Sequence, residues 1–149
     1  MKKGLVISDT GPIFSLAVID RLDILDALFD EVAIPQAVWE ELTRNPQAYH
    51  FKKIVANFQD RVRKITEFNN LTFVMDYGES EAVILYKELN ANYLLIDDRK
   101  ARQIAQNFGI NCVGTIGILS IARTKGFITE LKPVFKELLD QKGISQASC

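Results

Sequence analysis

Acidic residues occupy four places in the sequence where a strand or helix is expected to begin or end. They are Asp9, Glu41, the pair Glu79 and Glu81, and the doublet Asp97-Asp98. Carboxylates gathered in one place repel each other unless protons or cations neutralise them, and their hard oxygen atoms suit Mg²⁺ or Mn²⁺. A divalent cation held there would lower the pKa of a bound water and stabilise charge on a phosphate. These residue types therefore indicate hydrolysis of a phosphodiester without a covalent protein nucleophile.

Two of these acids have a simpler structural explanation when each is taken alone. Asp9 precedes Gly11-Pro12, so it could lie in a turn or cap a helix, roles that Asp fills often. Glu41 suits a solvent-exposed helix face, and the helical pattern does not separate it from Glu40. Neither residue is assigned to a site on its own evidence.

The remaining acids differ in how specific their signal is. Glu79 and Glu81 could simply complement the positive end of a helix dipole, an effect worth about 0.3–1 kcal/mol each. The doublet Asp97-Asp98 is the most specific signal, since two adjacent carboxylates repel and directly follow an apolar run. One of the two could cap the next helix while the other faces a crevice.

Short apolar runs predict the strands, and apolar residues at helical spacing predict the helices. The run Leu5-Val6-Ile7 ends at Asp9, and the run from Tyr93 to Ile96 ends at the aspartate doublet. Strands are expected at residues 5–9, 32–34, 62–65, 93–96 and 110–113. Helices are expected as two short segments between residues 12 and 28 with a break near residue 20, and at 36–44, 51–58, 79–89, 99–108, 116–125 and 131–139.

Strands that alternate with helices in this way predict an α/β fold with a parallel sheet covered by helices on both faces. In such sheets ligands bind beyond the carboxyl ends of the strands. Asp9, Asp97 and Asp98 follow predicted strands directly, so we expect their side chains at this edge.

Length and composition indicate one ordinary domain. With 149 residues, 48% of them hydrophobic, the chain can build one core, and we expect a domain over residues 1–142 with a flexible tail over 143–149. Its 18 basic and 19 acidic residues nearly balance, which argues against a polybasic coat protein or an acidic disordered chain. Two cysteines are too few for a disulfide framework, and no apolar run reaches the ~20 residues that cross a bilayer. We therefore expect a cytoplasmic protein without membrane insertion.

Five segments in order resemble a known family over nearly the whole chain. They read ISDTGPIFSL, IPQAVWEEL, DYGESEAVILYKEL, LLIDDRKAR and VGTIGILSIARTKGFI. Together they resemble a PIN domain, close to the VapC-type ribonuclease toxins and their uncharacterised prokaryotic relatives. Each motif is short, and the specificity lies in their order and spacing. The resemblance implies a three-layer PIN-like fold with a mostly parallel sheet between helices.

The resemblance also implies a set of catalytic residues. It matches Asp9, with Thr10 as supporting hydroxyl, and Glu41, which precedes a leucine as in the family. It favours Glu81 over its competitor Glu79, and Asp98 over its competitor Asp97. One departure is that many members carry a hydroxyl residue where this chain has Ile96.

The expected activity is an endoribonuclease that cleaves single-stranded RNA with Mg²⁺ or Mn²⁺, as the toxin of a toxin–antitoxin pair or a relative of one. Metal coordination is assigned to Asp9 and Asp98, with Asp97 and Glu79 as further candidates. Three cations after the doublet could contact RNA, although a charge run is usually a solvated helix face. They are Arg99, Lys100 and Arg102. The resemblance further implies a homodimer and a small antitoxin protein that covers the site.

Two rival functions remain open at this point. The first is an RNA-binding or interaction module that kept the fold without efficient chemistry, motivated by Ile96 and by the ambiguous middle acid. The second is a receiver-like or phosphatase-like protein that forms a phosphoaspartate. Asp9-Thr10-Gly11 lacks the second Asp, two residues on, that such phosphatases use.

Overall fold

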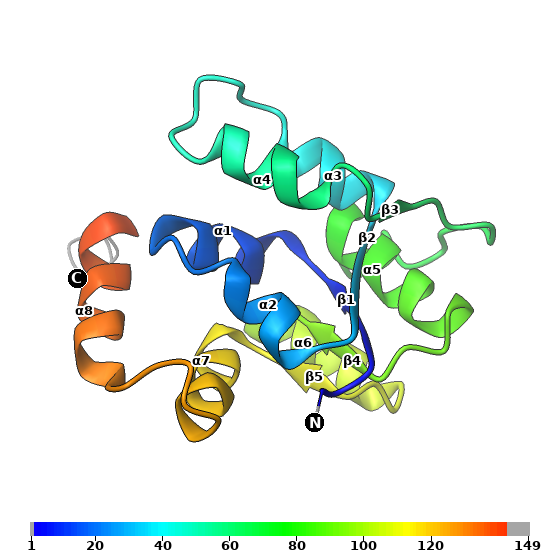
Figure 1. The fold of residues 1–149 in the computed structure, drawn as a ribbon. Coiled ribbons are helices and arrows are strands. Elements are labelled where there is room, and N and C mark those ends of the chain that lie inside the picture. The colour runs from blue at the N-terminus through cyan, green and yellow to red at the C-terminus, as the bar shows by residue number, and fades with distance from the viewer. Residues whose placement is uncertain (1, 143–149) are drawn as a thin grey trace.

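The computed structural model describes residues 2–142, and its centre is a five-stranded sheet with helices on both faces (Figure 1). The strands are β1 (Leu5–Ser8), β2 (Glu31–Pro35), β3 (Val62–Arg63), β4 (Tyr93–Leu95) and β5 (Cys112–Val113). Their order across the sheet is β3-β2-β1-β4-β5, and every neighbouring pair is parallel. Parallel pairing requires a crossover between successive strands, and helices provide each of these connections.

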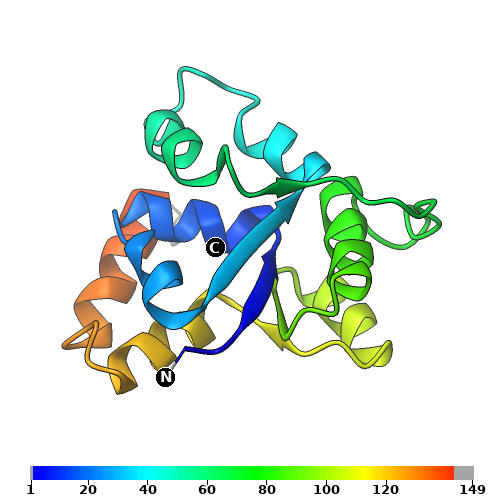
Figure 2. The same ribbon diagram turned by 45° about the vertical axis from the view of Figure 1, so that its right-hand side comes forward.

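The helices cover the sheet in two layers. They are α1 (Thr10–Val18), α2 (Asp23–Leu28), α3 (Gln36–Leu42), α4 (Phe51–Phe58), α5 (Tyr77–Glu88), α6 (Arg99–Asn107), α7 (Thr115–Thr124) and α8 (Leu131–Lys142). Figure 2 shows α5 and α6 on one side of the sheet and α1, α2 and α7 on the other. Helix α8 packs outside the second layer, against α1 and α7.

Alternate residues of each strand supply the cores of the two layers. Val6 of β1 and Leu95 of β4 belong to the apolar cluster under α1, α2 and α7. Ile7 of β1 and Leu94 of β4 belong to the cluster under α5 and α6. Because successive side chains of a strand point to opposite faces, a strand buried on both sides is a continuous apolar run. This explains why the strands could be predicted from the sequence.

The central strand β1 places its carboxyl end beside that of β4. Ser8 pairs with Leu95, and the Asp9 backbone N–H donates to the Leu95 carbonyl at 2.8 Å. From β1 the strand order runs outward in both directions, so a crevice forms where the chain reverses its course across the sheet. Asp9, Asp97 and Asp98 follow β1 and β4 at this edge, as expected.

The α/β class and the PIN-like arrangement of layers are confirmed, with differences at the ends of elements. The sheet is parallel throughout rather than mostly parallel. The helix expected at 36–44 ends at Leu42, and the strand expected at 62–65 is reduced to Val62–Arg63. The helix expected at 79–89 begins two residues earlier, at Tyr77. The expected tail at 143–149 lies outside the described residues.

Within residues 2–142, no helix has the length and apolar character needed to span a bilayer. Cys112, in β5, is a half-buried free thiol, and burial raises its pKa.

Candidate active site

Asp9 lies at the junction of β1 and α1, with its side chain turned into the protein. The residue is only 7% exposed, and its carboxylate does not cap α1. Burial raises the pKa of Asp9 to about 7, against the lowering effect of the Thr10 backbone amide. The negative charges of Glu79, Glu41 and Asp76 raise it further. An aspartate in this setting is stabilised by a proton or by a cation.

Glu41 reaches the same place from α3. Its Oε2 atom accepts a hydrogen bond from the Thr10 hydroxyl at 2.8 Å, which fixes the direction of the side chain. The two carboxylates meet over Gly78, at the start of α5. A Cβ atom at Gly78 would stand 3.0 Å from Glu41 Oε1 and 3.6 Å from Asp9 Oδ1. A glycine at this position therefore leaves the space that both acids face.

Glu79, the next residue of α5, belongs to the same group. It is 9% exposed, and its Oε1 atom accepts the Asp76 backbone N–H at 3.1 Å. Burial raises the pKa of Glu79, and the charges of Asp76, Asp98 and Glu41 add to the effect while the Asp76 amide opposes it. We call Asp9, Glu41, Asp76, Glu79 and Asp98 the carboxylate cluster.

Glu81, which the family resemblance favoured over Glu79, points to a different partner. It is 6% exposed, and its Oε1 atom accepts the Ala37 backbone N–H at 3.0 Å, at the start of α3. The charge of Glu81 and a hydrogen bond to it raise the pKa of Tyr77. Glu81 therefore holds α5 against α3. The catalytic role expected for it stays a prediction, and the geometry favours Glu79.

The side chains of the adjacent residues Asp97 and Asp98 bond to different helices. Asp97 accepts two hydrogen bonds from Thr115, one from its backbone N–H and one from its hydroxyl, both at 2.7 Å. These bonds fasten the start of α7 to the end of β4. Asp98 is exposed, accepts the Ala101 backbone N–H at 2.9 Å as the cap of α6, and raises the pKa of Glu79 by its charge. Asp98 therefore both caps α6 and lies close to the other acids, whereas Asp97 is bonded to α7.

Asp76 is a member of the cluster that reasoning from the sequence missed. The helix was expected to begin only at Glu79, whereas in the structure Asp76 is the N-terminal cap of α5. The signal that could have found it is the spacing Asp76-x-x-Glu79, which matches a capping box and predicts that both acids share one helix end. Its charge raises the pKa values of both Asp9 and Glu79.

The three cations expected to contact RNA have different environments. Arg102 is half-buried: its Nη2 atom donates to the Asp97 carbonyl at 3.4 Å, and its buried Nε atom has no hydrogen-bond partner. Arg99 and Lys100 are exposed and form no salt bridge within residues 2–142. Together with Asp97, Arg99 and Arg102 border a cavity of about 580 Å³. Contact with RNA stays a prediction for all three.

The donor set fits a hard divalent cation. All of its oxygens are carboxylate oxygens, the ligands that Mg²⁺ and Mn²⁺ prefer, and Gly78 leaves room between two of them. Among the described residues, however, no group of three or more Asp, Glu, His or Cys side chains lies close enough to hold an ion as it stands. Glu79 and Asp98 instead accept backbone amides. These side chains would have to turn toward the ion to bind it.

An open parallel sheet with Asp9 buried at the carboxyl end of β1 and two aspartates directly after β4 agrees with a PIN-like nuclease fold. The family DUF3368, described as a PIN domain, matches residues 5–147, so the chain belongs to the PIN-domain family. PIN domains are generally nucleases, and they typically bind divalent metals. No curated protein sequence matches the chain.

A solved structure shows the same fold. It is a PilT N-terminus domain protein, SSO1118, from the archaeon Sulfolobus solfataricus P2, and it matches with a TM-score of 0.53 at 19% sequence identity. The match covers 79% of this chain and 92% of that one, and at this identity it shows the fold alone. The strand order β3-β2-β1-β4-β5 also differs from the 2-1-3-4-5 order of receiver domains, which argues against a receiver-like protein.

Proposed function

We propose that this protein is an endonuclease that cleaves single-stranded RNA with Mg²⁺ or Mn²⁺. The observation that carries the proposal is the pair of carboxylates facing each other over Gly78, with Asp9 buried and its pKa raised to about 7. A buried acid among like charges costs stability and has no role in packing, whereas it becomes favourable once a divalent cation is bound. Its position at the carboxyl edge of β1 is where ligands bind in such sheets.

A bound cation would activate a water for attack on the phosphate and stabilise the charge that develops there. Asp9, Glu79 and Asp98 are the residues that would hold it. Thr10 donates to Glu41 and so keeps that carboxylate aimed at the space over Gly78. In this position Glu41 can orient a water or accept its proton at Oε1. The helix caps at Asp76 and Asp98 fix where the two helices begin relative to the sheet.

The choice of RNA rests on the resemblance to VapC-type toxins and on the exposed cations Arg99 and Lys100 that follow Asp98, which form no salt bridge within residues 2–142. Exposed cations attract a phosphate backbone, which an acidic site alone would repel. The same resemblance supports a homodimer, a cytoplasmic location and a small antitoxin protein that covers the site. A small reading frame adjacent to the gene would strengthen the toxin assignment.

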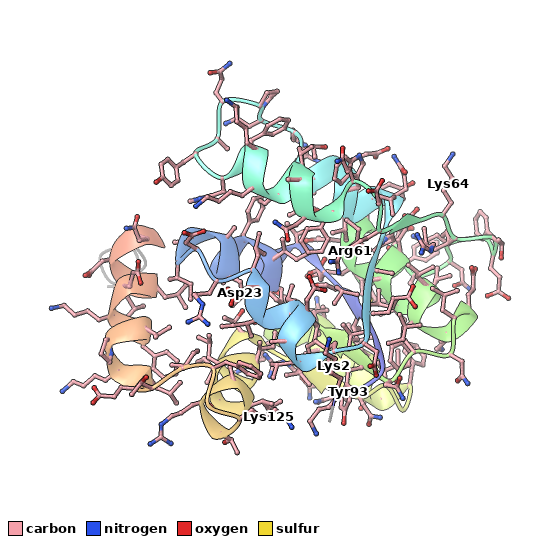
Figure 3. All side chains as sticks on the ribbon, viewed as in Figure 1. Lys2, Asp23, Arg61, Lys64, Tyr93 and Lys125 are labelled. Carbon is pink, nitrogen blue, oxygen red and sulfur yellow. The ribbon has the colours of Figure 1, made fainter. Side chains whose placement is uncertain are left out.

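Cleavage of a mixed single-stranded RNA by the purified chain tests the proposal. We expect cuts that require Mn²⁺ or Mg²⁺, disappear with EDTA, and are lost in Asp9→Asn. The matched control is Asp23→Asn in α2, which alters an exposed aspartate paired with Arg21 outside the cluster (Figure 3). Equal cleavage by wild type, Asp9→Asn and Asp23→Asn would identify a contaminant and contradict the proposal.

A second candidate function is a binding module of the same fold without catalysis. It is favoured by the hydrogen bonds that already engage Glu79 and Asp98 and by the absence of a ready metal-binding group within residues 2–142. This function predicts RNA binding that survives Asp9→Asn, with no metal-dependent cleavage in any variant. The two functions are therefore separated by the same assay combined with a binding measurement.

A further inference from the structure

We propose that Phe73 and Lys100 form a nucleotide subsite beside the carboxylate cluster, in which an unpaired base stacks on Phe73 while Lys100 contacts the adjoining phosphate. The inference rests on the proposed function and extends it, since it names the residues that select single-stranded over paired nucleic acid. It follows from the geometry of the loop between β3 and α5, from a cavity, and from an unpaired charge.

An ordered turn keeps the Phe73 side chain exposed to solvent. It is 92% exposed, at the middle of the turn formed by residues 72–74. The Leu71 carbonyl accepts the backbone N–H groups of Val74 and Met75, both at 3.1 Å, which closes the turn and leaves the ring outside it. Met75, two residues on, is only 7% exposed. A large apolar ring directed away from a buried neighbour has no role in the core.

The part of the loop that precedes this turn is fastened to α5 by side-chain hydrogen bonds. The Glu88 carboxylate accepts the backbone N–H groups of Thr66 and Glu67, at distances from 2.8 to 3.1 Å. Asn69 Nδ2 donates to the buried Ser80 hydroxyl at 2.8 Å. Figures 1 and 2 show the loop projecting from the side of the molecule opposite α8. A preorganised aromatic platform binds a base without first paying the entropy of ordering.

The ring and the acids border one cavity. Its volume is about 380 Å³, enough for one nucleotide of a strand that continues into solvent. Its lining includes Phe73, Asp76, Glu79, Asp98 and Lys100. Phe73 therefore lines the same cavity as three members of the carboxylate cluster. A base on this ring would bring its own phosphate next to the acids.

The charges around the cavity also favour a single-stranded nucleic acid as its ligand. Lys100 is exposed in the first turn of α6 and forms no salt bridge among the described residues, although Asp98 is two positions away. Lys64, at the start of the loop, also extends into solvent (Figure 3). Cations beside an aromatic platform are the usual elements of single-strand binding, where bases stack on rings and the backbone follows positive charge. A duplex keeps its bases stacked on each other and cannot offer one to Phe73.

Phe68 provides a matched control within the same loop. It is 88% exposed, so its substitution removes a comparable area of apolar surface. It borders a separate cavity with Leu71, Lys87 and Phe108, and no member of the carboxylate cluster lines that cavity. Lys132 in α8, on the opposite side of the molecule, is an exposed control for Lys100.

The experiment measures binding of a fluorescent single-stranded RNA of about 12 nucleotides by anisotropy in Ca²⁺, with the RNA checked for integrity afterwards. We expect Phe73→Ala to weaken binding by roughly 5- to 150-fold, and Phe73→Tyr, which keeps the π-face, to restore it. Phe68→Ala should bind as wild type. Lys100→Gln should weaken binding to all sequences and lower the salt slope by about one, while Lys132→Gln should not.

Abasic substitutions along the RNA then locate the stacked base. At one position the abasic RNA should bind wild type and Phe73→Ala equally, because the partner of the ring is gone. Wild-type binding by Phe73→Ala, an equal loss in Phe68→Ala, or failure of the wild type to bind RNA would each overturn the subsite. Metal-dependent cleavage unaffected by Phe73→Ala would keep the nuclease and remove the subsite. RNA binding that depends on Phe73, without metal-dependent cleavage, would support the subsite and contradict the nuclease.

Discussion

The carboxylate cluster and a second pair of acids, Glu81 and Asp97, lie at the same edge of the sheet and differ in what faces them. Glu81 meets the backbone N–H of Ala37, and Asp97 meets the N–H and hydroxyl of Thr115. In the cluster, Asp9 faces Glu41 across Gly78, with the charge of Glu79 close by. We call Glu81 and Asp97 the helix-holding pair.

The difference shows how one chain uses buried acids for two purposes. Donors at helix N-termini satisfy a carboxylate and position α3 and α7, so the charge contributes to stability. Carboxylates that face carboxylates keep an unfavourable charge until a proton or a cation arrives. The cluster should therefore govern metal binding and activity, and the helix-holding pair should govern folding.

The largest effect should be on stability, in metal-free buffer, at Asp9. Its pKa in the folded state, about 7, exceeds the ordinary 3.8, so the folded protein retains a proton that the unfolded chain releases. The stabilisation of the folded protein by this proton is fully present below about pH 4 and is lost as pH rises through about 7. Asp9→Asn should remove the loss and raise the free energy of unfolding at pH 8 by roughly 4 kcal/mol. Urea unfolding across this pH range measures it, and an Asp9→Asn protein that is less stable at pH 8 would contradict it.

The second effect separates Glu79 from Glu81 through activity. Glu79→Gln should lower kcat/KM by at least roughly 100-fold, because a cluster member would touch the cation. Glu81→Gln should lower it by less than about 10-fold, since its carbonyl oxygen can still accept from Ala37. Both variants are measured per folded molecule on the same RNA. The reverse ranking would restore the assignment that the family resemblance favoured.

The third effect is the loss of stability in Asp97→Asn. Replacing a charged acceptor of two hydrogen bonds should cost about 2 kcal/mol and lower Tm by roughly 4–8 °C. Thr115→Val, which removes one of the two donors, should lower Tm less. If Asp97→Asn unfolds like the wild type and instead abolishes cleavage, Asp97 belongs with the cluster.

The smallest effect concerns Thr10, which donates to Glu41. Thr10→Val removes this donor at nearly constant volume, and we expect a cost of about 1 kcal/mol in stability and a roughly 10-fold loss in kcat. Thr10→Ser should retain most of the activity because the hydroxyl remains. Unchanged kcat in Thr10→Val would show that Glu41 needs no partner to point at Gly78.

Much of the fold was predictable because the buried strands are continuous apolar runs. Leu5 to Ile7 and Tyr93 to Ile96 face helices on both sides, so they are readable without any partner. The short outer strand at Val62–Arg63 carries less of this signal, and its end was misplaced. Placing Asp9 and the aspartate doublet at one edge followed from parallel pairing alone.

The choice between neighbouring acids was not predictable, since it depends on other elements. Glu79 and Glu81 are two residues apart on one helix and point in different directions. Only the position of the Ala37 backbone N–H shows that Glu81 is the one that accepts a hydrogen bond from α3. The same holds for Asp97, whose partner Thr115 comes from a helix 18 residues further along. Sequence periodicity describes a single element and carries no information about which backbone amide arrives from another.

Calorimetric titration of the purified chain with Mn²⁺ tests most directly whether the carboxylate cluster is a metal site. We expect one bound ion in the wild type, loss of binding in Asp9→Asn and Glu79→Gln, and wild-type affinity in Asp97→Asn and Glu81→Gln. Equal Mn²⁺ affinity in Asp9→Asn and the wild type, or loss of binding only in the helix-holding pair, would contradict it.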